Sequence, residues 1–135
     1  MATYNWGFDH SFVAEVDMDA YQYRFVRSSS VTSGQIAPAT TAGGSVLGVL
    51  QNDCKAGDAA VVRMMGSTKL IVDAATTASP ITAGGLIKCG SSGMGLGTNT
   101  GFATSAFIVA VALEAMASGS GVGIEAMILP FYKNF

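Results

Sequence analysis

Charged residues are scarce in this sequence. Lys, Arg, Asp and Glu make up 12% of its 135 residues, whereas typical globular domains contain about 25%. Because half of the residues are hydrophobic, a monomer of this composition would expose much apolar surface to water. We therefore expect a partner to cover part of the surface. A compact monomer with loops rich in Ser, Thr and Gly is the alternative.

Runs of basic residues and long apolar segments are also missing. The seven Lys and Arg residues occur singly, and the net charge is −2. Clustered basic side chains supply most of the affinity for nucleic acid, so we expect no nucleic-acid partner. The first residues lack the basic and apolar regions of a signal peptide. The apolar run at 102–113 is shorter than the roughly 20 residues of a membrane span, so we expect a soluble protein.

The residues needed for familiar enzyme or metal chemistry are few. His10 is the only histidine, and it lies in a terminal segment that offers little fixed geometry. Cys54 and Cys89 are far apart and belong to no CxxC pair, which favours free thiols, with one intramolecular disulfide as the alternative. The glycine-rich stretch 93–98 lacks the spacing of a nucleotide-binding loop. We expect no catalytic residues, no cofactor, no metal and no small-molecule substrate.

Short β-rich segments separated by Gly, Asn, Asp, Ser and Thr predict an all-β fold, either a barrel or a sandwich. The predicted strands are 22–27, 31–37, 45–50, 59–65, 67–72, 81–88, 107–114 and 122–129. Gly66 predicts a bend or a tight hairpin, 90–101 a flexible loop and 117–121 a hairpin connection. The apolar run 60–65 predicts a strand buried on both faces, or a helical turn.

Aromatic residues are concentrated at the two ends, and none lies between residues 26 and 101. We therefore divide the chain into an aromatic and acidic N-terminal arm at 1–21, a β-domain at 22–130 and a short C-terminal tail at 131–135. Terminal aromatics can anchor in pockets of a neighbouring subunit or another protein, or they can fold back and close the mouth of a barrel. The predicted contact residues are Tyr4, Trp6, Phe8, Phe12, Phe131, Tyr132 and Phe135.

The stretch 48–63, GVLQNDCKAGDAAVVR, resembles a block that recurs in the capsid cement proteins of tailed phages, also called head decoration proteins. In that family the block reads G-V-L-Q-N-x-P-x-A-G-x-A-A-x-V-R. A Gly and a Ser/Thr-Lys pair follow it, and these are Gly66, Thr68 and Lys69 here. Cys54 replaces the usual proline, which affects a turn.

Three shorter segments extend this resemblance over most of residues 22–130. ITAG at 81–84, VALE at 111–114 and EAMILP at 125–130 are similar to segments of the same family. Gly85 stands where the family often has aspartate. The arm at 1–21 lies outside the resemblance.

The resemblance implies a β-barrel or β-tulip-like sandwich that is made in the host cytoplasm and binds the outer surface of the mature head. It implies stabilisation by bridging capsomers, with the major capsid protein and further copies of the chain, most often a homotrimer, as partners. It also implies no catalysis. Another virion structural role, such as a head fibre base, spike or tail component, is the alternative. A carbohydrate-binding module, in which Trp6 stacks on sugar, is a further alternative.

Overall fold

The chain is built from strands, as the composition predicts. The computed structural model describes residues 7–74, 81–97, 106–116 and 119–133, which contain nine strands and one 3-10 helix. The strands are β1 (Gly7–Ala14), β2 (Phe25–Ser28), β3 (Gln35–Pro38), β4 (Gly48–Leu50), β5 (Ala59–Ala74), β6 (Leu86–Cys89), β7 (Gly95–Gly97), β8 (Ala106–Ala112) and β9 (Gly119–Lys133). The helix η1 (Asp19–Tyr21) lies between β1 and β2. The all-β prediction is confirmed, and no helix in these ranges is long and apolar enough to cross a membrane.

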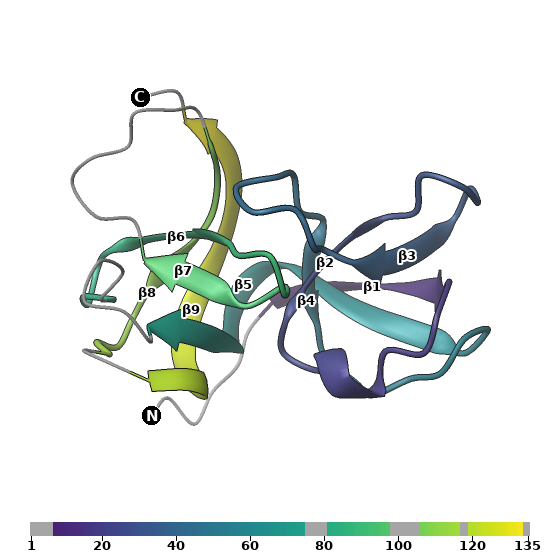
Figure 1. Cartoon of the computed structure of the whole chain (residues 1–135), viewed down its shortest axis with the longest axis horizontal. Coiled ribbons are helices and arrows are strands. Elements are labelled where there is room, and N and C mark those ends of the chain that lie inside the picture. The colour runs from purple at the N-terminus through teal and green to yellow at the C-terminus, as the bar shows by residue number, and fades with distance from the viewer. Residues whose placement is uncertain (1–6, 75–80, 98–105, 117–118, 134–135) are drawn as a thin grey trace.

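The strands form one sheet that closes on itself twice, and β5 belongs to both closures (Figure 1). The first ring has the order β1-β3-β2-β4-β5, and the pairing of β1 with the first half of β5 completes it. The second ring has the order β5-β7-β6-β8-β9, and the pairing of β9 with the second half of β5 completes it. Figure 1 shows β1 and β3 on one side of the molecule and β6 to β9 on the other.

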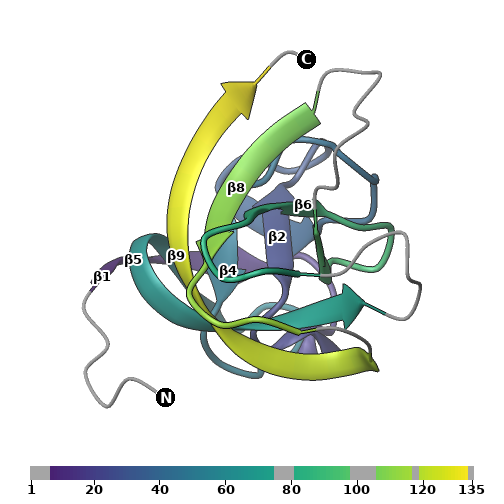
Figure 2. The ribbon, with the colours of Figure 1, turned by 90° about the vertical axis from the view of Figure 1, so that its left-hand side faces the viewer.

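Gly66 is the residue at which β5 passes from the first ring to the second. It pairs with Gly7 of β1 and with Ile128 of β9. Its φ of +104° is a backbone conformation that favours glycine. The strand continues through this point from Ala59 to Ala74, and Figure 2 shows it curving. The predicted bend is confirmed, and the alternative of a tight hairpin at Gly66 is wrong.

Each ring encloses its own buried cluster. The larger cluster belongs to the second ring and includes Leu70 and Ile124. The smaller cluster belongs to the first ring and includes Met18, Ile36 and Val62. Burial of such apolar side chains is the dominant favourable term in folding. The two rings are therefore stabilised by separate sets of apolar contacts.

Strands β2 and β4 separate the two clusters and contribute to both. Phe25 and Val49 pack in the second-ring cluster, whereas the next residues, Val26 and Leu50, pack in the first-ring cluster. Successive side chains of a strand point to opposite faces, so these two strands are buried on both sides. A strand in this position needs a continuous apolar sequence, which explains the pattern at 45–50.

The apolar run 60–65 forms a strand, as predicted, but it is not buried on both faces. Ala60 and Val62 are buried, whereas Val61 is half-buried and Met65 is 53% exposed. The alternation places one face of β5 on the first-ring cluster and leaves the other at the surface. The alternative of a helical turn is also wrong.

The first strand begins earlier than the sequence predicts. Residues 7–14, inside the predicted arm, form β1 and pair antiparallel with β5, from Gly7 opposite Gly66 to Val13 opposite Ala59. Sequence patterning missed this strand because its partner lies far along the chain and its residues are mostly exposed. The boundaries of the arm, β-domain and tail stay a prediction.

Several other predicted strand limits differ from the structure. The strands within 31–37, 45–50 and 81–88 begin later than predicted. Turns precede β3 and β6, whereas residues 45–47 before β4 form irregular structure. The predicted loop 90–101 contains β7. A Cβ on Gly95 would lie 2.9 Å from Cγ2 of Ile87, so glycine lets this short strand approach the core closely.

Strand β9 continues past Pro130 to Lys133, beyond the predicted end of this strand at residue 129. Ala110 pairs with Ile128 and Ile108 pairs with Phe131, so the register shifts around the proline. The pairing of β9 with β5 ends at Ile128. Proline lacks a donor and is tolerated at such irregular, single-partner positions.

Candidate docking surface

The structure describes the side chains of two of the predicted contact residues, Phe8 and Phe12, and places them differently. Phe8 lies on β1 and is 58% exposed. Phe12 lies on the same strand but is half-buried and packs against the first-ring cluster. Its ring meets that of His10 edge to face, with centroids 4.7 Å apart. Phe8 therefore stays a candidate contact residue, whereas Phe12 contributes to folding.

The other predicted contact residues cannot be placed as side chains. Tyr4, Trp6 and Phe135 lie outside the described residues. Phe131 and Tyr132 belong to β9, where they pair with Ile108 and Phe107 of β8, but their side chains also lie outside the described part.

Phe8 has an exposed apolar partner on the neighbouring strand. It pairs with Met65 of β5, which is 53% exposed. Cross-strand partners project from the same face of a sheet and touch each other. The pair, which we call the Phe8–Met65 surface, lies directly before Gly66, where the two rings meet. Sequence analysis missed Met65 because nothing in the run 60–65 distinguishes an exposed position from a buried one.

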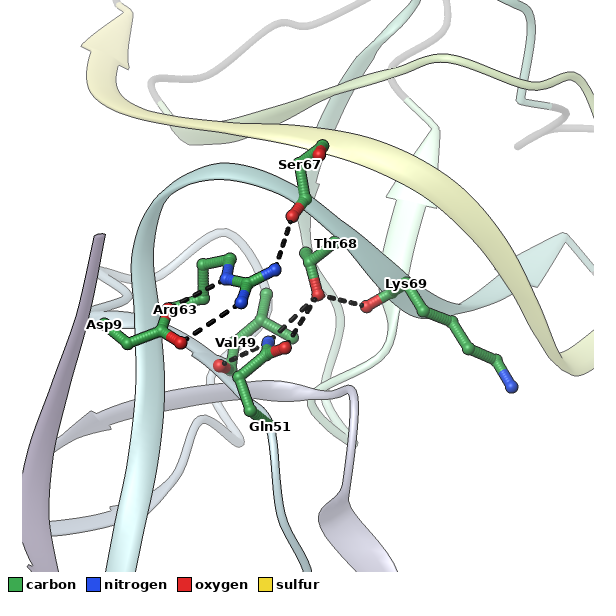
Figure 3. Close-up of polar contacts among 7 residues, drawn as sticks. All are labelled: Asp9, Val49, Gln51, Arg63, Ser67, Thr68 and Lys69. Atoms are coloured by element: carbon green, nitrogen blue, oxygen red, sulfur yellow. Dashed lines mark hydrogen bonds and ion pairs between the residues drawn. The ribbon is translucent and has the colours of Figure 1, made fainter. Parts of the chain in front are cut away.

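Arg63 holds β1 against β5 beside this surface (Figure 3). Its Nε donates to Oδ1 of Asp9 at 2.8 Å, and its Nη2 donates to Oδ2 at 3.1 Å. Its Nη1 donates to the carbonyl of Ser67 at 2.8 Å, beyond the bend. The hydrogen bond that Arg63 donates to Asp9 raises the pKa of Arg63 above its usual value, so the guanidinium stays charged. Gly7 leaves room for it, because a Cβ there would lie 2.6 Å from Cδ of Arg63.

Gln51 and Thr68 make a second polar link near the bend (Figure 3). Nε2 of Gln51 donates to Oγ1 of Thr68 at 2.9 Å and to the carbonyl of Val49 at 3.1 Å. Oγ1 of Thr68 donates to the carbonyl of Lys69 at 3.0 Å. Gln51 and Arg63 belong to the block at 48–63 that resembles cement proteins, and Thr68 belongs to the Ser/Thr-Lys pair that follows it. These three side chains are engaged within the chain at the junction of the rings, whereas Asp53 and residues 55–59 of the same block are exposed.

The two thiols lie in different clusters. Cys54 packs in the first-ring cluster and Cys89 in the second, and both are free, so the alternative of a disulfide between them is wrong. Burial raises the pKa of Cys89 to about 12, and burial followed by the charge of Asp58 raises the pKa of Cys54. A thiol is nucleophilic and binds metal only as the thiolate, so neither is set up for chemistry.

Other chemical groups in the described ranges do not converge on a reaction centre. No group of three or more His, Cys, Asp or Glu side chains there is placed to hold a metal ion. Glu125 is 3% exposed, and its Oε1 has no hydrogen-bond partner among these residues. Lys69 is its cross-strand partner and Arg63 lies close enough to feel its charge, and a single buried carboxylate in this setting does not by itself define a reaction.

Comparisons with known proteins give a match in fold and none in sequence. No family model matches the chain, and no curated protein is similar to it in sequence. Among solved structures, the chain is similar to the N base of head fiber gp8.5 of bacteriophage phi29, with a TM-score of 0.64 and 18% identity. The similarity covers 96% of this chain and 100% of that chain. At this identity the likeness shows a shared fold.

Proposed function

We propose that this chain is a phage virion structural protein that attaches to the outside of the head, as the base of a head fibre does. The observation that carries the proposal is the match in fold to a head fibre base, which extends over 96% of this chain and the whole of the other. A shared fold alone does not establish a shared function. The low charge and high apolar content of the sequence independently support a protein that works through a covered surface.

Capsid cement is the second candidate function. The sequence segment 48–63 favours it, because it resembles cement proteins and forms the junction between the rings. In both roles the partners would be the major capsid protein and further copies of the chain, as a homotrimer. Several contacts made by one oligomer reinforce each other, since each contact after the first is effectively intramolecular. Both roles require binding and no reaction.

We assign the attachment to the first ring. Of the described large apolar side chains, the three most exposed lie there: Val31 at 83%, Phe8 at 58% and Met65 at 53%. Phe8 and Met65 lie together on adjacent strands, and aromatic and methionine side chains are enriched in protein interfaces. Residues 1–6 lead directly into this surface at Gly7.

Sedimentation with heads that lack the protein tests the proposal. Purified protein is mixed with expanded and with unexpanded heads, and bound copies per head are measured. Saturable binding to expanded heads is expected. The two candidate roles differ in a second readout: cement raises the temperature at which the heads rupture, whereas a fibre base leaves it unchanged. Absence of binding by folded protein to its own heads would contradict both roles.

Two variants test the proposed contact surface. Replacing Phe8 and Met65 together by Ser is expected to reduce the affinity for heads by at least about tenfold, because both side chains contribute apolar contact area. Val122→Ser is the matched control, because Val122 is an apolar residue of the second ring that is 44% exposed. Deleting residues 1–6 tests the arm without removing β1. Unchanged occupancy in the Phe8 and Met65 variant would exclude this surface.

A further inference from the structure

A pocket between the β2–β3 connection and the segment before β4 is lined by hydrogen-bond donors of which most make no hydrogen bond within the described part of the chain. Its volume is about 410 Å³, within the range of roughly 300–1,000 Å³ that is common for binding pockets. The residues that line it are Arg27, Ser28, Ser30, Ser45, Val46 and Leu47. They come from two segments that are separated in sequence and do not include the Phe8–Met65 surface.

The floor of the pocket is fixed by both cores. Val46 packs against the second-ring cluster and Leu47 against the first-ring cluster. The backbone N–H of Leu47 donates to the carbonyl of Val26 at 2.8 Å. Because these contacts already fix Val46 and Leu47, ligand binding loses little conformational entropy there, which favours affinity.

The rim of the pocket is also held by hydrogen bonds. Oγ of Ser29 accepts from the backbone N–H of Val31 at 3.0 Å and from that of Thr32 at 2.9 Å. The backbone N–H of Ser29 donates to the carbonyl of Gln35 at 2.8 Å. These bonds shape the β2–β3 connection, from which Ser28 and Ser30 face the pocket. The pocket is thus preformed on both sides.

The donors in the pocket are largely unused. Arg27 makes one hydrogen bond within the described part of the chain, from Nη1 to the carbonyl of Ser28 at 3.1 Å. The hydroxyls of Ser28, Ser30 and Ser45 make none there. Arg63, by contrast, is paired with Asp9. Because no acidic side chain lines the pocket, its electrostatics favour an anionic group.

The residues that line the pocket restrict the chemical class of ligand that it can bind. No aromatic side chain lines the pocket, so a sugar ring would find no aromatic face to stack on. Nucleic acid requires several phosphate contacts, and Arg27 is the single cation present. A carboxylate matches the planar fork of a guanidinium and accepts hydroxyl donors at the same time.

We propose that the Arg27 pocket binds a carboxylate presented by an acidic segment of a partner protein. The identity of that partner as a protein of the phage head rests on the proposed function, whereas the chemistry of the pocket does not. The pocket would add a polar, orienting contact to the apolar contact made by the Phe8–Met65 surface.

Fluorescence anisotropy with a labelled peptide of alternating Glu and Gly tests the pocket on the isolated full chain. The Glu peptide is expected to bind saturably and the matching Gln peptide at least about tenfold more weakly. Arg27→Gln should weaken binding of the Glu peptide by about tenfold, and Arg27→Lys should weaken it less, because it keeps the charge and loses the fork. Ser45→Asp, at an exposed position, should abolish binding by placing a competing carboxylate in the pocket.

Lys55→Gln is the matched control, since it removes the same charge from a side chain that is 67% exposed and absent from the pocket. It should change the affinity by less than about twofold. An equal loss in Lys55→Gln and Arg27→Gln would overturn the proposal, as would no binding by the wild type. Amide shifts in NMR spectra that miss residues 27–30 and 45–47 would also overturn it.

The peptide assay contains no heads, so its outcome is separate from the sedimentation test. Heads that bind the protein while the Glu peptide does not would overturn the pocket and leave the proposed function standing. Peptide binding at Arg27 without any binding to heads would support the pocket and overturn the proposed function.

Discussion

The two rings share one strand but differ in what they place at the surface. The second ring surrounds the larger cluster, and its strands β8 and β9 pair along most of their length. The first ring surrounds the smaller cluster and carries the Phe8–Met65 surface, the Arg27 pocket and the Asp9–Arg63 ion pair. We propose a division of labour, in which the second ring supplies stability and the first ring supplies attachment.

The division does not make the rings independent. β2 and β4 send alternate side chains into the two clusters, and β5 is continuous through Gly66. Loss of either cluster therefore exposes one face of β2 and β4, the strands whose other face packs in the remaining cluster. We expect the chain to fold as one cooperative unit.

The largest effects are expected from cavities in the two clusters. Leu50→Ala in the first ring and Leu70→Ala in the second each remove a fully buried side chain. Each should lower the free energy of unfolding by about 2–5 kcal/mol. Urea unfolding followed by circular dichroism and by NMR signals from each ring should show one shared transition. Two separate transitions would contradict the coupling through β2 and β4.

Two glycine substitutions compare a clash with rigid backbone and a clash with a flexible side chain. A Cβ on Gly48 in β4 would strike the backbone carbonyl of Arg63, which the ladder holds in place. Gly48→Ala should cost about 1–3 kcal/mol. A Cβ on Gly123 in β9 would strike the side chain of Lys69. The Nζ of Lys69 lies 5.3 Å from the centroid of the Tyr23 ring, and this flexible side chain can swing away from it. Gly123→Ala should cost less than about 1 kcal/mol, and thermal unfolding of both variants measures the difference.

The Asp9–Arg63 ion pair is expected to contribute a smaller, local effect. Asp9→Asn keeps the shape but loses the carboxylate that pairs with Arg63, and it should cost about 1 kcal/mol. Hydrogen exchange should show reduced protection of the β1 amides. The control is Asp19→Asn, which breaks the exposed 3.7 Å contact with Lys55 and should cost less than about 0.5 kcal/mol. Equal protection of β1 in Asp9→Asn and the wild type would show that the pair does not hold the strand.

The smallest effect at neutral pH is expected for the two thiols. Neither should react with a thiol reagent at about pH 8 in the folded protein, because burial raises both pKa values. The neutral thiol of Cys89 is favoured by folding, so its contribution to stability is present below pH 9.0 and declines as the pH rises toward about 12. Cys89→Ala should remove this part of the alkaline decline. Rapid labelling of Cys89 in the native protein would contradict its burial.

Sequence reasoning predicts the fold class and some local features of the chain. Turn residues between short β-rich segments indicate the all-β fold, and Gly66 indicates the bend. The residues that determine these features are close together in the sequence, so sequence patterns are sufficient to predict them.

Features that depend on distant contacts could not be predicted. β1 is a strand because Asp9 and its neighbours pair with a segment around Arg63, and no local pattern shows that pairing. Phe12 is half-buried while Phe8 is exposed, although both are aromatics of one segment. The Arg27 pocket forms only when residues 27–30 meet residues 45–47. Sequence spacing does not show which face of a strand or loop another segment will cover.

A cryo-EM reconstruction of heads saturated with the protein tests the central claim most directly. The account predicts density on the outer surface of the head, with the first ring against the shell and the Phe8–Met65 surface and Arg27 facing the capsid protein. The second ring should point away from the shell. Density with the second ring against the shell, or density confined to the tail, would contradict the account.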